Sequence, residues 1–174
     1  MAFDKVTIGK EAPEVVNVVI EIPRGVHHKY EYDDEMEAIK LDRVLHSAVF
    51  YPTDYGFIPH TLAEDGDHLD AMVILTDPVF PGCVVEARPI GMLDMEDEAG
   101  RDWKIIAVAD KDPKLSNIKT AGDLDIHFKK EIEVFFRNYK ELEHKKVTVK
   151  NWLPKEDALS RIEKARKTYL KKTI

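Results

Sequence analysis

The sequence predicts a mainly β protein with flanking α-helices. Three observations support this class: all but one of the expected strands lie within the first 110 residues, turn residues separate several of them, and helical spacing of apolar residues comes late. Many strands followed by helices favour a β-barrel or curled sheet with helices packed outside it. The chain has 174 residues, so we expect one domain over 1–174.

The first strands are recognisable from composition. Residues 15–22 form a β-branched run that Pro23 ends. A second strand is expected at 29–32, before an acidic turn at 33–34. Residues 39–45 alternate apolar and charged side chains, which predicts a half-buried strand.

The later strands are expected at 71–75, 84–95, 103–109 and 146–149. Pro89 and Gly91 interrupt the longest of them, which indicates a bend or bulge. A turn at 98–100 makes 84–95 and 103–109 partners in a hairpin.

Two helices are expected near the end of the chain. Asp123 or Asp125 can cap the first, and the second begins near Pro154. The first has its apolar side chains at helical spacing, at Phe128, Ile132, Phe135, Phe136, Tyr139 and Leu142. The second carries its stripe at Ala158, Ile162, Ala165 and Tyr169.

Charge and composition limit the possible partners. The net charge of −7 argues against nucleic acid, because phosphate backbones attract basic surfaces. Cys83 is the only cysteine, which suits a reducing compartment, and we expect it to be a small buried apolar residue. No apolar run approaches the roughly 20 residues that span a bilayer. We therefore expect a soluble, cytoplasmic protein with no membrane partner.

A row of aspartates, Asp65, Asp67 and Asp70, is crowded into one short loop. Such crowding is stable if each acid faces water or if cations lie between them, and hard divalent ions prefer oxygen ligands. An exposed Asp-Gly turn is the simpler interpretation. An EF-hand calcium loop does not fit, because its sixth position is Asp70 instead of Gly and its twelfth is Thr76 instead of Glu.

A second acidic cluster lies at the tip of the expected hairpin, at Asp94, Glu96, Asp97, Glu98 and Asp102. A solvated turn is again possible. If the two clusters meet at one end of a barrel, they form a site for several metals, as in phosphoryl chemistry with ions roughly 3.5–4 Å apart. Basic and phenolic side chains that could bind phosphate lie near these acids in sequence, at Lys29, Arg43, Tyr51, Tyr55, Lys104, Tyr139 and Lys140.

These segments together resemble the family I soluble inorganic pyrophosphatases of prokaryotic type, from about residue 15 to 165. The central motif is 65–70, Asp-Gly-Asp-His-Leu-Asp, which is similar to that family's D-G-D-x-x-D signature. Motifs in the same order surround it, at 20–23, 29–31, 42–43, 50–56, 88–91, 97–104 and 135–143. The resemblance implies an OB-like closed five-stranded β-barrel and hydrolysis of pyrophosphate to two orthophosphates by a metal-activated water.

The resemblance also implies roles for single residues. Asp67 is the expected general base, with Tyr55 hydrogen-bonded nearby. Mg²⁺ ions, several per site, are expected on Asp65, Asp70, Asp97 and Asp102, with Glu21 and Glu31 reaching them mostly through water. The phosphates are expected on Lys29, Arg43, Lys104, Tyr139 and Lys140. Family members of this length form homohexamers, which we expect here.

Two other functions fit parts of the sequence. An OB module that binds single-stranded nucleic acid needs a basic groove, which the net charge opposes. A calcium-binding or structural domain would use the acidic loops without needing four basic residues beside them. His27 and His28 could bind metal, although an exposed loop pair is the simpler interpretation.

Overall fold

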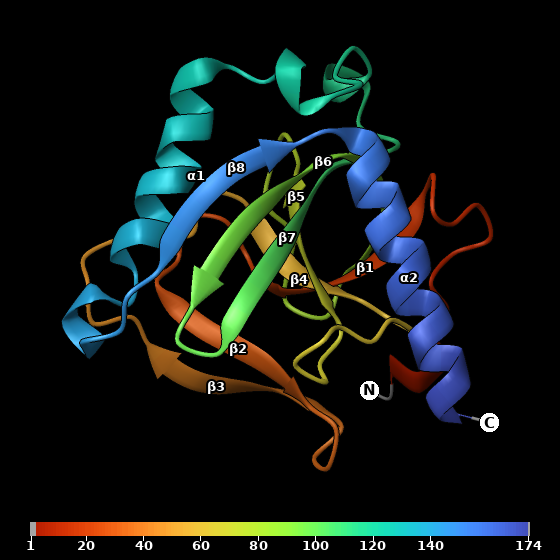
Figure 1. The fold of residues 1–174 in the computed structure, drawn as a ribbon, viewed down its shortest axis with the longest axis horizontal. Coiled ribbons are helices and arrows are strands. Elements are labelled where there is room, and N and C mark those ends of the chain that lie inside the picture. Colours follow the sequence, from red (N-terminus) through yellow and green to blue (C-terminus); the bar gives the residue numbers. More distant parts are fainter. Residues whose placement is uncertain (1–2, 174) are drawn as a thin grey trace.

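The computed structural model describes residues 3–173 and confirms a mainly β chain with two α-helices. The strands are β1 (Val16–Ile22), β2 (His28–Asp33), β3 (Ala38–Val44), β4 (Asp54–Ile58), β5 (Leu69–Ile74), β6 (Val84–Asp97), β7 (Gly100–Ala109) and β8 (Thr148–Leu153). The helices are α1 (Ile126–Asn138) and α2 (Lys155–Thr173), and they flank the sheet on opposite sides (Figure 1).

The main sheet returns on itself. Its strand order is β1-β4-β5-β7-β6-β8, and β1 pairs with β6 as well as with β4. Five strands therefore make a ring of pairings, and β8 extends the sheet from the outer side of β6. Strands β2 and β3 form a separate hairpin that lies beside one end of this ring (Figure 1).

The β6–β7 hairpin is the longest pairing and confirms the expected turn. Its register runs from Ala87 opposite Ala109 to Asp97 opposite Gly100, with a shift between Pro89 and Gly91 where a bulge was expected. Strand β7 also pairs with β5 in parallel, so both acidic segments belong to neighbouring strands.

Side chains of β7 alternate between two apolar clusters, as the twofold period of a strand requires. Trp103, Ile105 and Ala107 pack in the cluster that contains Ala158, Ile162 and Ala165 of α2. Ile106 and Val108 pack in the cluster that contains Ile132, Phe135 and Phe136 of α1. Each helix therefore covers its own side of the strand that carries Asp102 and Lys104.

Capping explains where α1 begins. The Asp125 carboxylate accepts hydrogen bonds from the backbone N–H groups of His127 and Phe128 at 2.8 and 3.1 Å. Asp123 instead accepts from Thr120, at a preceding 3-10 turn. The prediction for Leu142 was wrong: it lies beyond the helix in a further 3-10 turn and is 60% exposed.

Three strand predictions need correction. Strand β4 was not predicted, because Pro52 just before it and Gly56 within it are typical of turns. Residues 39–45 do form a strand, but β3 is mostly exposed, since only β2 pairs with it. The last strand begins and ends later than the expected 146–149.

Cys83 was expected to be a buried apolar residue. It is only partly buried, against the apolar cluster of α2.

Within residues 3–173, neither α-helix combines the length and the apolar composition needed to cross a membrane.

Candidate metal and phosphate site

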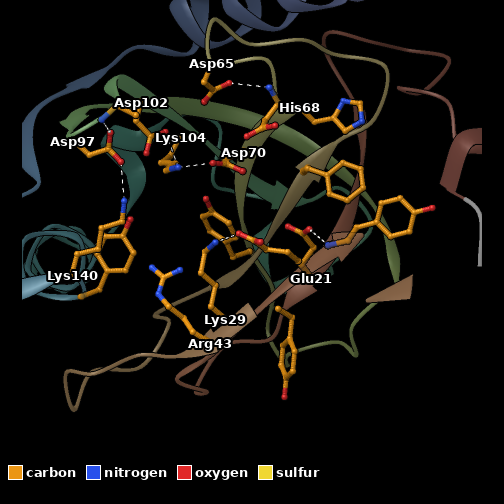
Figure 2. A pocket seen from close by; sticks show the side chains of 18 of the residues that line it. Glu21, Lys29, Arg43, Asp65, His68, Asp70, Asp97, Asp102, Lys104 and Lys140 are labelled. Carbon is orange, nitrogen blue, oxygen red and sulfur yellow. Dashed lines mark hydrogen bonds and ion pairs between the residues drawn. The ribbon is translucent and has the colours of Figure 1, made fainter. Parts of the chain in front are cut away.

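One cavity of about 490 Å³ gathers every residue to which the resemblance gave a role, whereas Tyr51, Asp94 and Glu96 do not line it. Figure 2 shows the four labelled aspartates on one side of this cavity with Lys104 among them, and Lys29, Arg43 and Lys140 opposite, with Glu21 on the side of Lys29. The lining includes Glu21, Lys29, Glu31, Arg43, Tyr55, Asp65, Asp67, Asp70, Asp97, Asp102, Lys104, Tyr139 and Lys140. They come from strands β1 to β7, from the loop before β5 and from the end of α1, whereas β8 and α2, among the described elements, contribute none.

The acidic loop, residues 64–68, connects β4 to β5. Its turn is held internally, because the backbone N–H of Asp67 donates to a carboxylate oxygen of Asp65 at 3.0 Å. Gly66 has a φ of 99°, which side chains disfavour and glycine permits. Desolvation and the nearby charges of Asp65 and Asp70 raise the pKa of Asp67 above its ordinary value.

Lys104 lies between the two acidic segments. Its ammonium nitrogen is 2.5 Å from an oxygen of Asp70 and 2.7 Å from one of Asp102, and the residue is 4% exposed. Burial alone would lower the pKa of Lys104, but Asp70, Tyr55 and Asp102 outweigh it and raise the pKa well above the ordinary value. The pKa of Asp102 is raised by burial, and the charge of Lys104 only partly opposes this rise.

The hairpin tip, residues 97–100, is held by lysines that follow α1. The ammonium of Lys140 lies 2.8 Å from Asp97 and 3.5 Å from Glu98 (Figure 2 shows the first contact). Lys145 reaches Glu98 at 3.1 Å. Burial opposes ionisation of Asp97, but the hydrogen bond from Lys140 prevails and lowers the Asp97 pKa. Burial likewise disfavours charge on Lys140, yet Tyr139 and Asp97 raise its pKa.

The β2–β3 hairpin supplies a second set of cations. Lys29 contacts Glu31 and lies 3.6 Å from Asp42, and burial lowers its pKa. Arg43 donates to Asp42 at 2.6 Å and to Glu143 at 3.1 Å. Each cation therefore has a carboxylate beside it and also faces the cavity.

Glu21 is the most buried carboxylate of the cavity. It stands at a register shift in β1 between Ile20 and Ile22, and its side chain is turned to accept a 2.7 Å hydrogen bond from the Tyr32 backbone. Burial raises the pKa of Glu21 to about 8, and the hydrogen bond from Tyr32 only partly opposes this.

Tyrosines close the floor of the cavity. Tyr55 on β4 is buried, and its burial raises the pKa of the phenol well above the ordinary value. The Lys104 ammonium lies 5.5 Å from the centre of the Tyr55 ring. Burial also raises the pKa of Tyr139, so both phenols keep their protons and can serve as donors.

The donor set fits hard divalent cations. Between residues 3 and 173, no three His, Cys, Asp or Glu side chains already converge as a finished ligand set. The Lys104 ammonium instead occupies the space between Asp70 and Asp102, as a stand-in positive charge. Burial is the main cause of the raised pKa values of Glu21, Asp67 and Asp102. Among the described residues, the lining holds nine carboxyl groups and only five lysine or arginine side chains, so the cavity has more acids than its cations neutralise.

Sequence reasoning missed several lining residues. Lys145 comes to the hairpin tip because the chain reverses at His144, which has a φ of 57°, and no motif signals that turn. An aromatic side of the cavity was also missed, where Phe57 stacks on His68 with ring centres 5.1 Å apart and on Tyr32 at 6.1 Å. Alternating aromatics in β2 and β4 were the only available signal. The rings of His27 and His28 lie 5.0 Å apart at a tilt of 47°, with His28 in β2 instead of a loop.

Carboxylates beside Lys, Arg and Tyr donors are what an enzyme needs to hold a phosphate anion together with its cations. The family model described as inorganic pyrophosphatase matches residues 18–170. An inorganic pyrophosphatase of Thermus thermophilus is 54% identical over 158 residues, covering 89% of this chain and 90% of that protein. One from Sulfolobus acidocaldarius is 53% identical over 164 residues, covering 92% and 95%.

Solved structures agree with the sequence matches. The crystal structure of inorganic pyrophosphatase from Thermus thermophilus has a TM-score of 0.95 at 48% identity, covering 98% of this chain and 99% of that chain. The protein is therefore an enzyme of the hydrolase class. It belongs to the inorganic pyrophosphatase family, and membership of that family implies a divalent metal cofactor.

Proposed function

We propose that this enzyme hydrolyses inorganic pyrophosphate to two orthophosphates, with Mg²⁺ as its cofactor. The observation that carries the proposal is the single cavity in which both acidic segments meet the cations of β2, β3, β7 and the end of α1. A polyanion that travels with divalent cations needs this mixture of charges. A cavity lined by so many acids opposes nucleic acid as the ligand.

Asp65, Asp70 and Asp102 are the residues we assign to the first ions, and Asp97 joins Asp102 for ions that arrive with substrate. Glu21 and Glu31 lie further round the cavity and reach these ions mostly through water. When bound, the ions neutralise phosphate charge and lower the pKa of a water molecule. Asp70 and Asp102 already share one cation in the form of the Lys104 ammonium, which supports their pairing.

Asp67 is the general base in this proposal. The backbone N–H of Asp67 donates to Asp65, which fixes the loop and leaves the Asp67 carboxylate to face the cavity. A raised pKa brings a carboxylate closer to the value at which it accepts a proton most effectively near neutral pH. Tyr55 keeps its phenolic proton and can donate a hydrogen bond nearby.

Lys29, Arg43, Lys104, Tyr139 and Lys140 hold the two phosphate groups. Charge-assisted hydrogen bonds from lysine and arginine stabilise the negative charge that develops on the leaving phosphate. In the absence of substrate these cations rest on carboxylates such as Asp97 and Asp42. Binding of pyrophosphate therefore exchanges one anionic partner for another, and no unpaired cation has to wait in the cavity.

Four finer features belong to the same proposal. The ring of strand pairings supports an OB-like closed five-stranded barrel. We infer a single domain over 1–174, a cytoplasmic location, and assembly as a homohexamer by analogy with family members of this length.

A phosphate-release assay with pyrophosphate at neutral pH tests the function. We expect release with Mg²⁺, loss of release when EDTA removes the metal, and its return when Mg²⁺ is restored. Calcium should compete for the same oxygens but support little turnover, because its longer and looser coordination misplaces the water. The D77N variant, which changes an exposed aspartate outside the cavity, is the matched control for cavity variants. Absence of release with Mg²⁺, or full activity with calcium alone, would overturn the proposal.

A further inference from the structure

Behind the cavity, one side chain of α2 contacts both the acidic loop and strand β7 of the acidic hairpin. The guanidinium carbon of Arg161 lies 3.5 Å from the centre of the Trp103 ring on β7. The same guanidinium lies 3.3 Å from the carboxylate of Glu64, the first residue of the acidic loop. Helix α2 follows the side of the sheet opposite α1 (Figure 1), and Arg161 itself does not line the cavity.

Trp103 is the link to the hairpin. It stands between Asp102 and Lys104 in sequence, and these two line the cavity whereas Trp103 packs with the apolar cluster of α2. Successive side chains of a strand point to opposite faces, so the position of Trp103 fixes the direction of both neighbours. A planar guanidinium stacks well on an indole ring, and Arg101 also lies over Trp103, at 5.5 Å.

Glu64 is the link to the loop. A backbone hydrogen bond closes the loop on itself, because Ala63 donates its N–H to the carbonyl of Asp67 at 2.8 Å, which ties Glu64 to the residues that follow it. A backbone hydrogen bond from Leu62 to the carbonyl of Ala165 in α2, at 3.0 Å, fixes the start of this closed loop. A shift of Glu64 therefore shifts Asp65 and Asp67 with it.

We infer that Arg161 is a positioning residue, which holds Asp65 and Asp67 at a fixed distance from Asp102 through Glu64 and Trp103. This inference rests on the proposed assignment of those aspartates. Glu64 is exposed, and exposed ion pairs contribute only about 0–1 kcal/mol to stability. The contact with Arg161 therefore serves geometry more than stability.

Lys164 provides a matched control within the same helix. Its ammonium reaches the same Glu64 oxygen at 3.1 Å, but its side chain is far more exposed than that of Arg161. Among the contacts of the described residues, it makes none with Trp103. R161M should remove both the ion pair with Glu64 and the stack on Trp103. R161K should keep the positive charge but lose the planar stack. K164M should remove only the second cation beside Glu64.

The test measures Mg²⁺ affinity without substrate, by calorimetry on metal-free protein. We expect R161M to weaken Mg²⁺ binding about 10-fold, in the range of 10–100-fold typical when outer partners of metal ligands are lost. R161K should fall between R161M and wild type, and K164M should stay within about twofold. In a W152F background, where Trp103 is the only tryptophan, the emission of metal-free protein should change in R161M and not in K164M.

Coupling with Glu64 makes the inference specific. E64Q should weaken Mg²⁺ binding, and adding E64Q to R161M should weaken it less than the two single effects multiplied together. A thermal unfolding curve identifies variants that simply lose structure. Unchanged Mg²⁺ affinity in R161M, or equal losses in R161M and K164M, would overturn the positioning role. Failure of the wild-type protein to hydrolyse pyrophosphate would instead refute the proposed function. That assay is independent of the Mg²⁺-binding measurements on the variants, so the two failures can be told apart.

Discussion

The acidic loop at 64–68 and the hairpin tip at 97–100 both carry carboxylates into the cavity, but different cations hold them. Arg161 and Lys164 hold the loop from α2, outside the cavity. Lys140 and Lys145 hold the tip from inside, where they also line the cavity. The cations of the loop are therefore independent of substrate, whereas those of the tip must respond to it.

This difference supports the proposal that the two segments bind ions at different stages. The cations that hold the loop lie outside the cavity, so on the proposed assignment the loop suits ions that are present before substrate. At the tip, Lys140 is paired with Asp97, so on the same assignment Asp97 would become available only when a phosphate attracts the lysine away. Lys104 lies between the acidic loop and the hairpin tip, in contact with Asp70 and Asp102.

The largest expected effect is in the loop. D67N should lower kcat by about 10²–10⁴-fold, because the amide cannot accept the proton, while binding of Mg²⁺ and pyrophosphate changes little. Steady-state kinetics and calorimetry measure the two quantities, with D77N as the control. If D67N loses Mg²⁺ affinity before turnover, Asp67 is mainly a metal ligand and the assigned base is wrong.

Releasing the hairpin tip tests the other half of the comparison. K140M should raise KM for pyrophosphate by roughly 10-fold or more, since a charged hydrogen bond contributes about 1.5–3 kcal/mol. Mg²⁺ affinity without substrate should stay near the wild-type value. K145M is the matched control, because Lys145 contacts Glu98 from a more exposed position, and its effect on KM should be smaller. A loss of resting Mg²⁺ affinity as large as the rise in KM would contradict the division of roles.

Glu21 lines the cavity but belongs to neither the acidic loop nor the hairpin tip. Its ionisation makes the stability of the protein depend on pH. Its pKa is raised to about 8 in the folded protein, so its contribution to stability is complete below the unfolded value of 4.5 and is lost as pH rises towards 8. E21Q, which keeps the acceptor for Tyr32, should therefore unfold at higher denaturant than wild type above pH 8 in EDTA. The expected difference is at least about 1 kcal/mol, and it should vanish near pH 4. Equal stability of both proteins above pH 8 would show that Glu21 ionises freely.

The smallest effect is expected at the start of α1. D125A removes the cap of the helix that leads to Lys140, and should lower the free energy of unfolding by about 1 kcal/mol. Because the far end of α1 packs through Phe135 and Phe136, kcat should remain within about twofold of wild type. Chemical denaturation and kinetics measure both quantities. Unchanged stability would mean that the cap contributes nothing.

The carboxylates and cations that line the cavity could be located from the sequence because they belong to short contiguous motifs, such as 65–70. Fold class and hairpin turn were also accessible from composition. Strand β4 could not be predicted from composition, because glycine is typical of turns and Gly56 lies in the middle of the strand. The strand needs glycine at this position, because a Cβ there would lie 1.9 Å from the carbonyl oxygen of Val19. Partners such as Arg161 and Trp103 are distant in sequence, and only the packing of α2 brings them together.

The most direct test of the two-stage account is anomalous X-ray scattering from crystals soaked in Mn²⁺, with and without a non-hydrolysable pyrophosphate analogue. Without the analogue, we expect metal only among Asp65, Asp70 and Asp102, with Lys140 still on Asp97. With the analogue, further metal should appear at Asp97, and Lys140 should contact the phosphate. Metal at Asp97 without the analogue, with Lys140 still paired to it, would contradict the account.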